Sequence, residues 1–270
     1  MKKLLTLLAL CTASLTMAQT TMNIYQSNGS VLQIPLNTID SITYTVNSSG
    51  IVSNPGAGVT YGGVNYPTVV LGNGQEWMAQ NLRTAQYNDD TPITLVTDNA
   101  QWAANMNNGT TVPMMSWYDN DQATNTFGAL YNWYAVSPTT NGNRNVCPVG
   151  WHVPTDAEWN TLIGYLDPSF NPNENIQSAT AGGKMKSTGT QYWQNANQDA
   201  TNESGFSGFP GGFRNGDGTF GNVGGFGYWW SSSEYYSGNA WSRNLRSHDG
   251  SAGRYYDYEV LGYSVRCLRD

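Results

Sequence analysis

The chain has 270 residues, only 11% of them charged, and a formal net charge of −7. This balance excludes nucleic acid and anionic lipid as partners, because both require a basic face. The chain has 30 Gly, 10 Trp and 17 Tyr but little charge. Its surface is therefore expected to consist of neutral polar and aromatic groups, as is common in extracellular proteins that meet neutral polar ligands.

Residues 1–18 have the pattern of a secretory signal peptide. Lys2 and Lys3 precede an apolar run at residues 4–10, and small residues lead to Ala18, after which we expect cleavage. The apolar run is shorter than the ~20 residues of a membrane span, and no later stretch is long enough. We therefore expect an exported protein, extracellular or outer-membrane-associated, with no transmembrane segment in the mature chain.

Two other interpretations of this N-terminus are less favoured. A lipoprotein anchored through Cys11 would need a small residue before that cysteine, and Leu10 stands there. A buried N-terminal helix does not account for the charged residues that precede the apolar run.

A small β element is expected at residues 19–47. Residues 22–25 and 31–34 alternate around a Ser-Asn-Gly-Ser turn at 27–30, which predicts a hairpin, and residues 39–46 resemble a third strand. An exposed edge of this element could accept a strand from another protein.

Residues 48–62 are rich in Ser, Gly and Asn, which predicts a flexible linker and places the main domain at 63–270. The clearest helix of that domain covers residues 155–166. Thr155 is a favourable N-cap, and Glu158 completes a capping box. The spacing i, i+3, i+4 and i+7 predicts one buried face, formed by Trp159, Leu162, Ile163 and Leu166. A second short helix is expected at 179–187.

Gly and aromatic residues interleave in the C-terminal part of the chain. Strands are predicted at 228–232, 240–245 and 263–268, and long loops occupy much of the segment between Asn215 and Tyr258. Trp229, Trp230 and Trp241 are expected to pack inward, because strand Trp next to Gly usually does so.

Cys147 and Cys267 are the two cysteines of the mature chain. Export would place them in an oxidising compartment, so we expect a disulfide that closes a loop of about 120 residues. The alternative, a catalytic thiol, requires a nearby base, and the chain has only His152 and His248.

Several longer stretches occur together in one order. They are NGQEWMAQNL at 73–82, GALYNW at 128–133, CPVGWHVPTDAEW at 147–159, SGF at 204–206, WWSS at 229–232 and YSVRC at 263–267. On these stretches, much of residues 63–270 resembles the Fibrobacter succinogenes major paralogous domain family, found in surface proteins of Fibrobacter and Bacteroidetes. The segment 22–46 resembles a short N-terminal element common in Bacteroidetes surface proteins.

The resemblance implies an α+β, C-type lectin-like domain with few helices, short strands and long loops, preceded by the small β element. That fold also includes the formylglycine-generating enzymes. The family is associated with surface attachment and polysaccharide contact, and it offers no catalytic residues to carry over. A binding or adhesion domain is therefore expected, and the alternative is a structural or protein-interaction subunit of a surface appendage.

An uncharacterised enzyme is the least favoured alternative. Residues 205–209 fail the Gly-x-Ser-x-Gly pattern at the last position, and the two histidines form no zinc-binding motif. No spacing singles out a carboxylate pair for glycoside hydrolysis. A formylglycine-type oxygenase would need two reactive thiols, and both cysteines are expected in the disulfide.

Neutral polysaccharides are bound by aromatic rings and by polar side chains that reach the sugar hydroxyls. The candidate ligand residues are Tyr235, Tyr236, Asn244, Arg246, Asp249, Arg254 and Tyr255. Core aromatics and solvated loops are the alternative interpretation of this region. The Pro-containing calcium motifs of C-type lectins are absent, and residues 241–244 only faintly resemble their Trp-Asn-Asp motif.

Asn215 and Asp217 are weak candidates for a structural calcium site in a Gly-rich turn. The remaining EF-hand positions are missing, so a plain hairpin turn explains the segment more simply and no cofactor is expected.

Overall fold

The structure, a computed structural model, describes residues 21–25, 31–35, 50–194 and 196–270, and it divides into two units after residue 46. In the first unit, β1 (Thr21–Tyr25) and β2 (Val31–Pro35) pair antiparallel, which confirms the expected hairpin. The signal peptide at 1–18, Cys11 and the third strand expected at 39–46 lie outside the described residues.

The second unit begins before the expected boundary near residue 60. Residues 53–61 contain β3 (Ser53–Pro55) and β4 (Val59–Tyr61), and Ile51 is buried in the core. The structure thus differs from the linker expected over 48–62. The glycines of this segment suggested flexibility, but Gly56 is needed for close packing. A Cβ at that position would lie 2.1 Å from Thr68 Oγ1.

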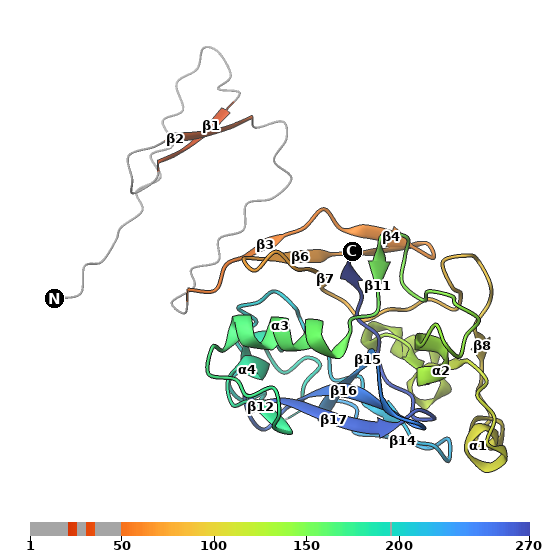
Figure 1. Cartoon of the computed structure of the whole chain (residues 1–270). Helices are drawn as coiled ribbons and strands as arrows, with labels where there is room; N and C mark the ends of the chain where they lie inside the picture. The colour runs from red at the N-terminus through yellow and green to blue at the C-terminus, as the bar shows by residue number, and fades with distance from the viewer. Residues whose placement is uncertain (1–20, 26–30, 36–49, 195) are drawn as a thin grey trace. The chain divides into compact units, whose positions relative to one another are not determined.

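Two antiparallel sheets form the framework of the second unit (Figure 1). The five-stranded sheet has the order β11–β18–β7–β6–β3 and joins strands from both ends of the unit, and the four-stranded sheet has the order β12–β17–β16–β15. Their further bounds are β6 (Thr68–Leu71), β7 (Glu76–Met78), β11 (Trp151–His152), β12 (Ile176–Ser178), β15 (Phe226–Tyr236), β16 (Asn239–Arg246), β17 (Ala252–Tyr258) and β18 (Leu268–Arg269).

The remaining elements are short. The strands are β5 (Val64–Tyr66), β8 (Thr94–Leu95), β9 (Met114–Ser116), β10 (Leu130–Tyr131), β13 (Phe213–Arg214) and β14 (Phe220–Gly221). The helices are α1 (Asn99–Asn108), α2 (Trp133–Val136), α3 (Asp156–Leu166), α4 (Ala181–Met185) and the 3-10 turns η2 (Tyr118–Asn120) and η3 (Gln122–Phe127). The fold is thus α+β with few helices. Within the described ranges, no helix has the length and apolar character needed to cross a membrane.

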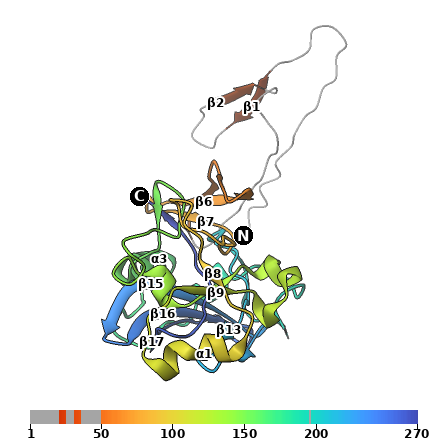
Figure 2. The same ribbon diagram turned by 90° about the vertical axis from the view of Figure 1, so that its right-hand side faces the viewer.

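Helix α3 lies between the two sheets, as Figure 1 and Figure 2 both show. Thr155 caps it, and the Glu158 side chain bonds back to the Thr155 backbone, so the predicted capping box is confirmed. Its four predicted apolar residues are buried, with Trp159 packed 4.8 Å from Trp77 of β7 between ring centroids. The expected second helix is present as α4, two residues shorter at each end.

The C-terminal strands differ from the prediction in extent. Trp229 and Trp230 are fully buried, as expected. Trp241 was also expected to pack inward but is only half-buried, because its ring packs against the exposed Tyr235 and Tyr256. Strands β15 and β16 run past their predicted ends. Residues 252–258, expected in loops, form β17. The strand expected at 263–268 is reduced to β18, because residues 262–264 make only isolated bridges to three different segments.

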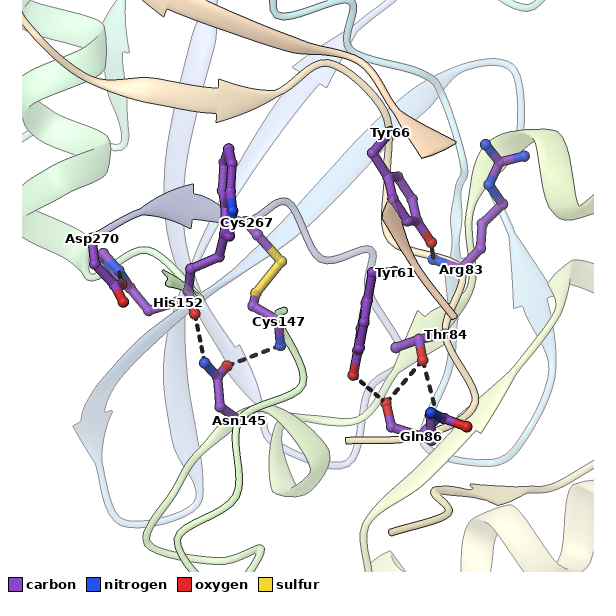
Figure 3. Close-up of a disulfide and its surroundings, with 11 residues drawn as sticks. Tyr61, Tyr66, Arg83, Thr84, Gln86, Asn145, Cys147, His152, Cys267 and Asp270 are labelled. Carbon is purple, nitrogen blue, oxygen red and sulfur yellow. Dashed lines mark hydrogen bonds and ion pairs between the residues drawn. A yellow bond between two sulfur atoms is a disulfide. The ribbon is translucent and has the colours of Figure 1, made fainter. Parts of the chain in front are cut away.

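Cys147 and Cys267 form the expected disulfide, with Cα atoms 5.9 Å apart. Both cysteines are fully buried in the core, and each precedes a strand of the β11–β18 pair. Asn145 supports the bridge: its Oδ1 accepts a hydrogen bond from the Cys147 backbone N–H at 2.9 Å (Figure 3). The bond therefore joins the segment before α3 to the last strand.

Arg266 is buried with no exposed surface, and among the residues that the structure describes its hydrogen-bond partners include no carboxylate. Its guanidinium donates to Asn81 Oδ1 at 2.6 and 3.1 Å, to the carbonyl of Met78 at 3.0 Å and to the carbonyl of Phe206. The Phe206 ring lies 4.1 Å from the guanidinium carbon. Burial lowers the pKa of Arg266 well below its usual value.

Loss of the disulfide should destabilise the domain. We expect the Cys147→Ser/Cys267→Ser variant to lose about 2–5 kcal/mol of unfolding free energy, since the bridge restricts the unfolded chain. Urea denaturation of the oxidised protein, the reduced protein and the variant would measure this. Identical midpoints for the oxidised protein and the variant would contradict it.

Replacement of Arg266 by Met should cost at least about 3 kcal/mol, because several buried acceptors would lose their donor. Arg144→Met is the matched control. The Arg144 side chain is 37% exposed and pairs with Asp89 at 3.3 Å, so its loss should cost about 1 kcal/mol or less. Equal losses for the two variants in thermal or urea unfolding would argue against the buried network.

Candidate functional site

Five aromatic side chains gather where β15, β16 and β17 extend beyond α3. We call this set the aromatic surface, and its members are Tyr235, Tyr236, Trp241, Tyr256 and Tyr258. The four tyrosines are 44–67% exposed. Since strand residues alternate between faces, Trp241, Tyr256 and Tyr258 lie on the same face of the sheet as Arg243 and Arg254.

The rings of the aromatic surface contact one another. Tyr235 stacks on Tyr256 with centroids 4.3 Å apart and an interplanar angle of 21°, and its ring meets the edge of Trp241 at 4.5 Å. Tyr236 lies 4.9 Å from Tyr235. These contacts hold four of the five rings as one group, and the fifth, that of Tyr258, lies on the same face of the sheet. Each exposed ring leaves apolar area open to solvent.

A buried charge network lies beneath the Trp241 ring and consists of Arg254, Arg243 and Asp156. The Arg254 guanidinium lies 3.2 Å from the Trp241 ring centroid and binds both carboxylate oxygens of Asp156 at 2.8 and 2.9 Å. Arg243 donates to the same carboxylate at 2.8 Å. Burial raises the pKa of Asp156, but hydrogen bonds and positive charge from the two arginines outweigh it and leave the pKa below its usual value.

The seven predicted ligand residues do not form one site. Tyr235 and Tyr236 lie together on the aromatic surface, whereas Arg254 beneath them is only 15% exposed and is engaged by Asp156. By strand alternation, Asn244 and Tyr255 lie on the opposite face, and Asn244 is 7% exposed.

The two remaining predicted residues lie at the end of β16, which is Arg246, and in the turn that follows it, which contains Asp249. Arg246 and Asp249 approach each other to 3.6 Å, and Asp249 accepts hydrogen bonds from the backbone and hydroxyl of Ser251. These contacts stabilise the turn after β16. None of them connects Arg246 or Asp249 to a residue of the aromatic surface.

Tyr256 and Tyr258 were missed by the sequence analysis. The signal was present: Arg254, Tyr256 and Tyr258 recur at every second position, which is the strand period. The segment was expected to be a loop, and in a loop that alternation carries no information about which side chains share a face.

The weak calcium candidates Asn215 and Asp217 lie in the turn between β13 and β14. Asn215 Oδ1 accepts from Gly216 N at 2.8 Å, and Asp217 Oδ1 accepts from Thr219 N at 2.9 Å and from its hydroxyl at 2.6 Å. The turn thus has its own hydrogen bonds. In the part of the chain that the structure describes, no three His, Cys, Asp or Glu side chains gather as a metal site would require.

A carboxylate pair lies beside the aromatic surface. Glu259 follows β17 and is 6% exposed, and Glu234 precedes Tyr235 in β15. Burial, with a further contribution from the negative charge of Glu234, raises the pKa of Glu259 to about 7. Glu259 is therefore partly protonated near neutral pH.

Comparison with known proteins finds one family. The model described as the Fibrobacter succinogenes major domain matches residues 70–269. The matched range starts within β6, ends with β18 and includes the whole aromatic surface. No curated protein and no solved structure matches the chain.

The raised pKa of Glu259 predicts a pH-dependent stability. A folded pKa above the unfolded value stabilises the fold below about pH 4.5, and this contribution is lost as the pH rises through about 7. Relative to Glu259→Gln, the wild type should therefore lose about 1–3 kcal/mol between pH 4 and pH 8. Urea denaturation at both pH values measures the difference. The same difference in unfolding free energy between the two proteins at pH 4 and at pH 8 would contradict the prediction.

Proposed function

The chain belongs to the Fibrobacter succinogenes major domain family, and we propose that it is a non-catalytic domain of the bacterial cell surface that binds neutral polysaccharide through its aromatic surface. The observation that carries this proposal is the group of exposed tyrosines at 235, 236 and 256, whose rings contact one another, together with the exposed Tyr258 on the same face of the sheet. Exposed apolar groups gathered in this way commonly mark an interaction site.

The chemistry of the surface favours a saccharide. Tyr rings offer an apolar face to the C–H groups of a sugar and a hydroxyl for its polar groups, and they lose little conformational entropy on binding. The guanidiniums of Arg243 and Arg254 share the carboxylate of Asp156, and the two arginine side chains are only 2% and 15% exposed, so they offer an anionic ligand little accessible positive charge. A neutral polymer therefore fits this surface better than an anionic one.

The proposed location rests on the signal-peptide pattern of residues 1–18. The disulfide is in keeping with an oxidising compartment outside the cytoplasm. A relation to the C-type lectin-like fold is part of the same proposal. It is supported by the pairing of early and late strands, β7 with β18, and by the long loops that connect short strands.

An open surface of this kind should bind weakly, with a dissociation constant on the order of 0.1–1 mM, or about −4 to −5.5 kcal/mol. Adhesion would then depend on many copies acting together. The alternative occupant of the aromatic surface is another surface protein, because Tyr and Trp are also enriched in protein interfaces.

The proposal is tested by calorimetry and affinity electrophoresis with neutral plant and host polysaccharides. We expect Tyr235→Ala/Tyr256→Ala to weaken binding at least about tenfold, or 1.4 kcal/mol. Met106→Ala on α1 is the matched control, since Met106 is 51% exposed and lies outside the surface; it should bind as the wild type does.

Equal binding by the double variant would place the ligand elsewhere. No binding to any polysaccharide, together with capture of an outer-membrane protein that the same double variant abolishes, would replace the proposal by the protein-interaction alternative.

A further inference from the structure

A cavity of about 480 Å³ has no lining residue in common with the aromatic surface. It lies between the β4–β5 hairpin, the turn at residues 86–90 and Pro148–Val149, which follow the disulfide cysteine. Its volume falls in the range of ligand pockets, roughly 300–1,000 Å³.

One wall of the cavity is fixed by hydrogen bonds around Gln86. The Tyr61 hydroxyl and the Thr84 hydroxyl both donate to the Gln86 carbonyl at 2.9 Å. Figure 3 shows the Tyr61 hydroxyl directed at Gln86. Gln86 in turn donates from Nε2 to Asp90 Oδ1 at 2.8 Å, so this wall is formed before any ligand enters.

A second part of the lining, Pro148 and Val149, belongs to the disulfide segment. The Asn88 backbone donates to the Asn145 carbonyl at 2.9 Å, and the Asn145 side chain accepts from the Cys147 backbone. Pro148 is buried, whereas Val149 is 80% exposed at the rim. A rigid wall with an apolar rim lowers the entropy cost of ligand binding.

Polar groups of the lining are left available. The half-buried Asn88 side chain makes no hydrogen bond with any residue that the structure describes, and neither does the Thr60 hydroxyl. Asp90 Oδ1 accepts from Gln86, and its second carboxylate oxygen has no hydrogen-bond partner in the described part of the chain. The lining therefore offers a donor-acceptor amide, a hydroxyl and an acceptor beside the apolar Val59, Pro148 and Val149.

Charge limits what can enter. Asp90 is the one charged residue of the lining, and neither Lys nor Arg belongs to it. A carboxylate, sulfate or phosphate would be repelled by Asp90 and would find no counter-charge. A neutral sugar ring could hydrogen-bond to the polar lining groups through its hydroxyls and pack its C–H face against the apolar lining residues.

We propose that this cavity is a second saccharide subsite, which takes one neutral hexopyranose unit. The choice of a sugar as ligand rests on the proposed function, whereas the cavity itself shares no residue with the aromatic surface. The chain would thus hold a polysaccharide at two places, one an exposed aromatic surface and the other a hollow lined by hydrogen-bonding groups.

The test is a heteronuclear NMR titration of the full mature chain with two probes, methyl glucoside and methyl glucuronide. We expect saturable shifts of the Thr60, Asn88 and Val149 amide signals with the neutral sugar at about 1–10 mM, and at least about tenfold weaker binding of the acid. Asn88→Ala should weaken the neutral sugar about fivefold or more, while its backbone bond to Asn145 is retained.

Asp90→Asn should reduce the difference in affinity between methyl glucoside and methyl glucuronide, because it removes the negative charge that repels the acid. Asn tolerates the positive φ of 65° at that position, so the turn should be preserved. Equal binding of both sugars by the wild type, or unchanged binding by Asn88→Ala, would overturn the proposal.

The Tyr235→Ala/Tyr256→Ala variant separates the two sites. Cavity shifts that survive in it support the subsite even if the aromatic surface fails its own test. Shifts confined to the aromatic surface in the wild type would overturn the subsite and leave the proposed function standing. No shift at either place would overturn both.

Discussion

The hydrogen bonds between Arg266 and Asn81 join more of this domain than any other contact described above. Asn81 Oδ1 accepts from Arg266 and, at 2.8 Å, from Trp229 Nε1, while its Nδ2 donates to the Phe127 carbonyl and to Ser264 Oγ. Apart from Phe127, these residues and Phe206, whose carbonyl accepts from Arg266, come from four of the stretches that resemble the family, at 73–82, 204–206, 229–232 and 263–267. The family pattern thus describes a buried network. Tyr235, Tyr256, Thr60 and Asn88, which carry the two proposed sites, lie outside these stretches.

Buried cations play the same part elsewhere in the unit. Lys186, Arg214 and Arg243 are at most 2% exposed. The Lys186 ammonium donates to the carbonyls of Gln198, Arg246 and Asp249, and Arg214 donates to those of Val96 and Gly218. Long loops leave carbonyls without ladder partners, and buried carbonyls must be satisfied. These buried basic residues contribute no positive charge to the surface. They reduce the number of the chain's twelve Lys and Arg residues that can lie on it.

The parts of the fold that could be predicted from sequence were those with local signals. The Thr155 capping box and the apolar spacing of α3, the pairing of β1 with β2 and the pairing of Cys147 with Cys267 all follow from short-range chemistry or from a count of cysteines. Helix α1 was missed, although Asp98 caps it and Gly109 ends it in the left-handed conformation, because its Asn-rich sequence has low helix propensity. Strand β3 is paired with β6, and β17 lies between its hairpin neighbour β16 and the distant β12. Arg254 was taken for a ligand residue because Asp156, 98 positions away, could not be identified as its partner from sequence.

The disulfide has a consequence for the fate of the protein among extracellular proteases. The loop that it closes spans 120 positions and contains α3, α4, the whole four-stranded sheet and every ring of the aromatic surface. Exposed loop tips are the preferred places for a proteolytic cut. A single cut anywhere between Cys147 and Cys267 leaves two fragments that remain covalently linked, so the piece bearing the tyrosines stays attached to the piece bearing β6 and β7. Release of that piece would require a second cut or a reductant.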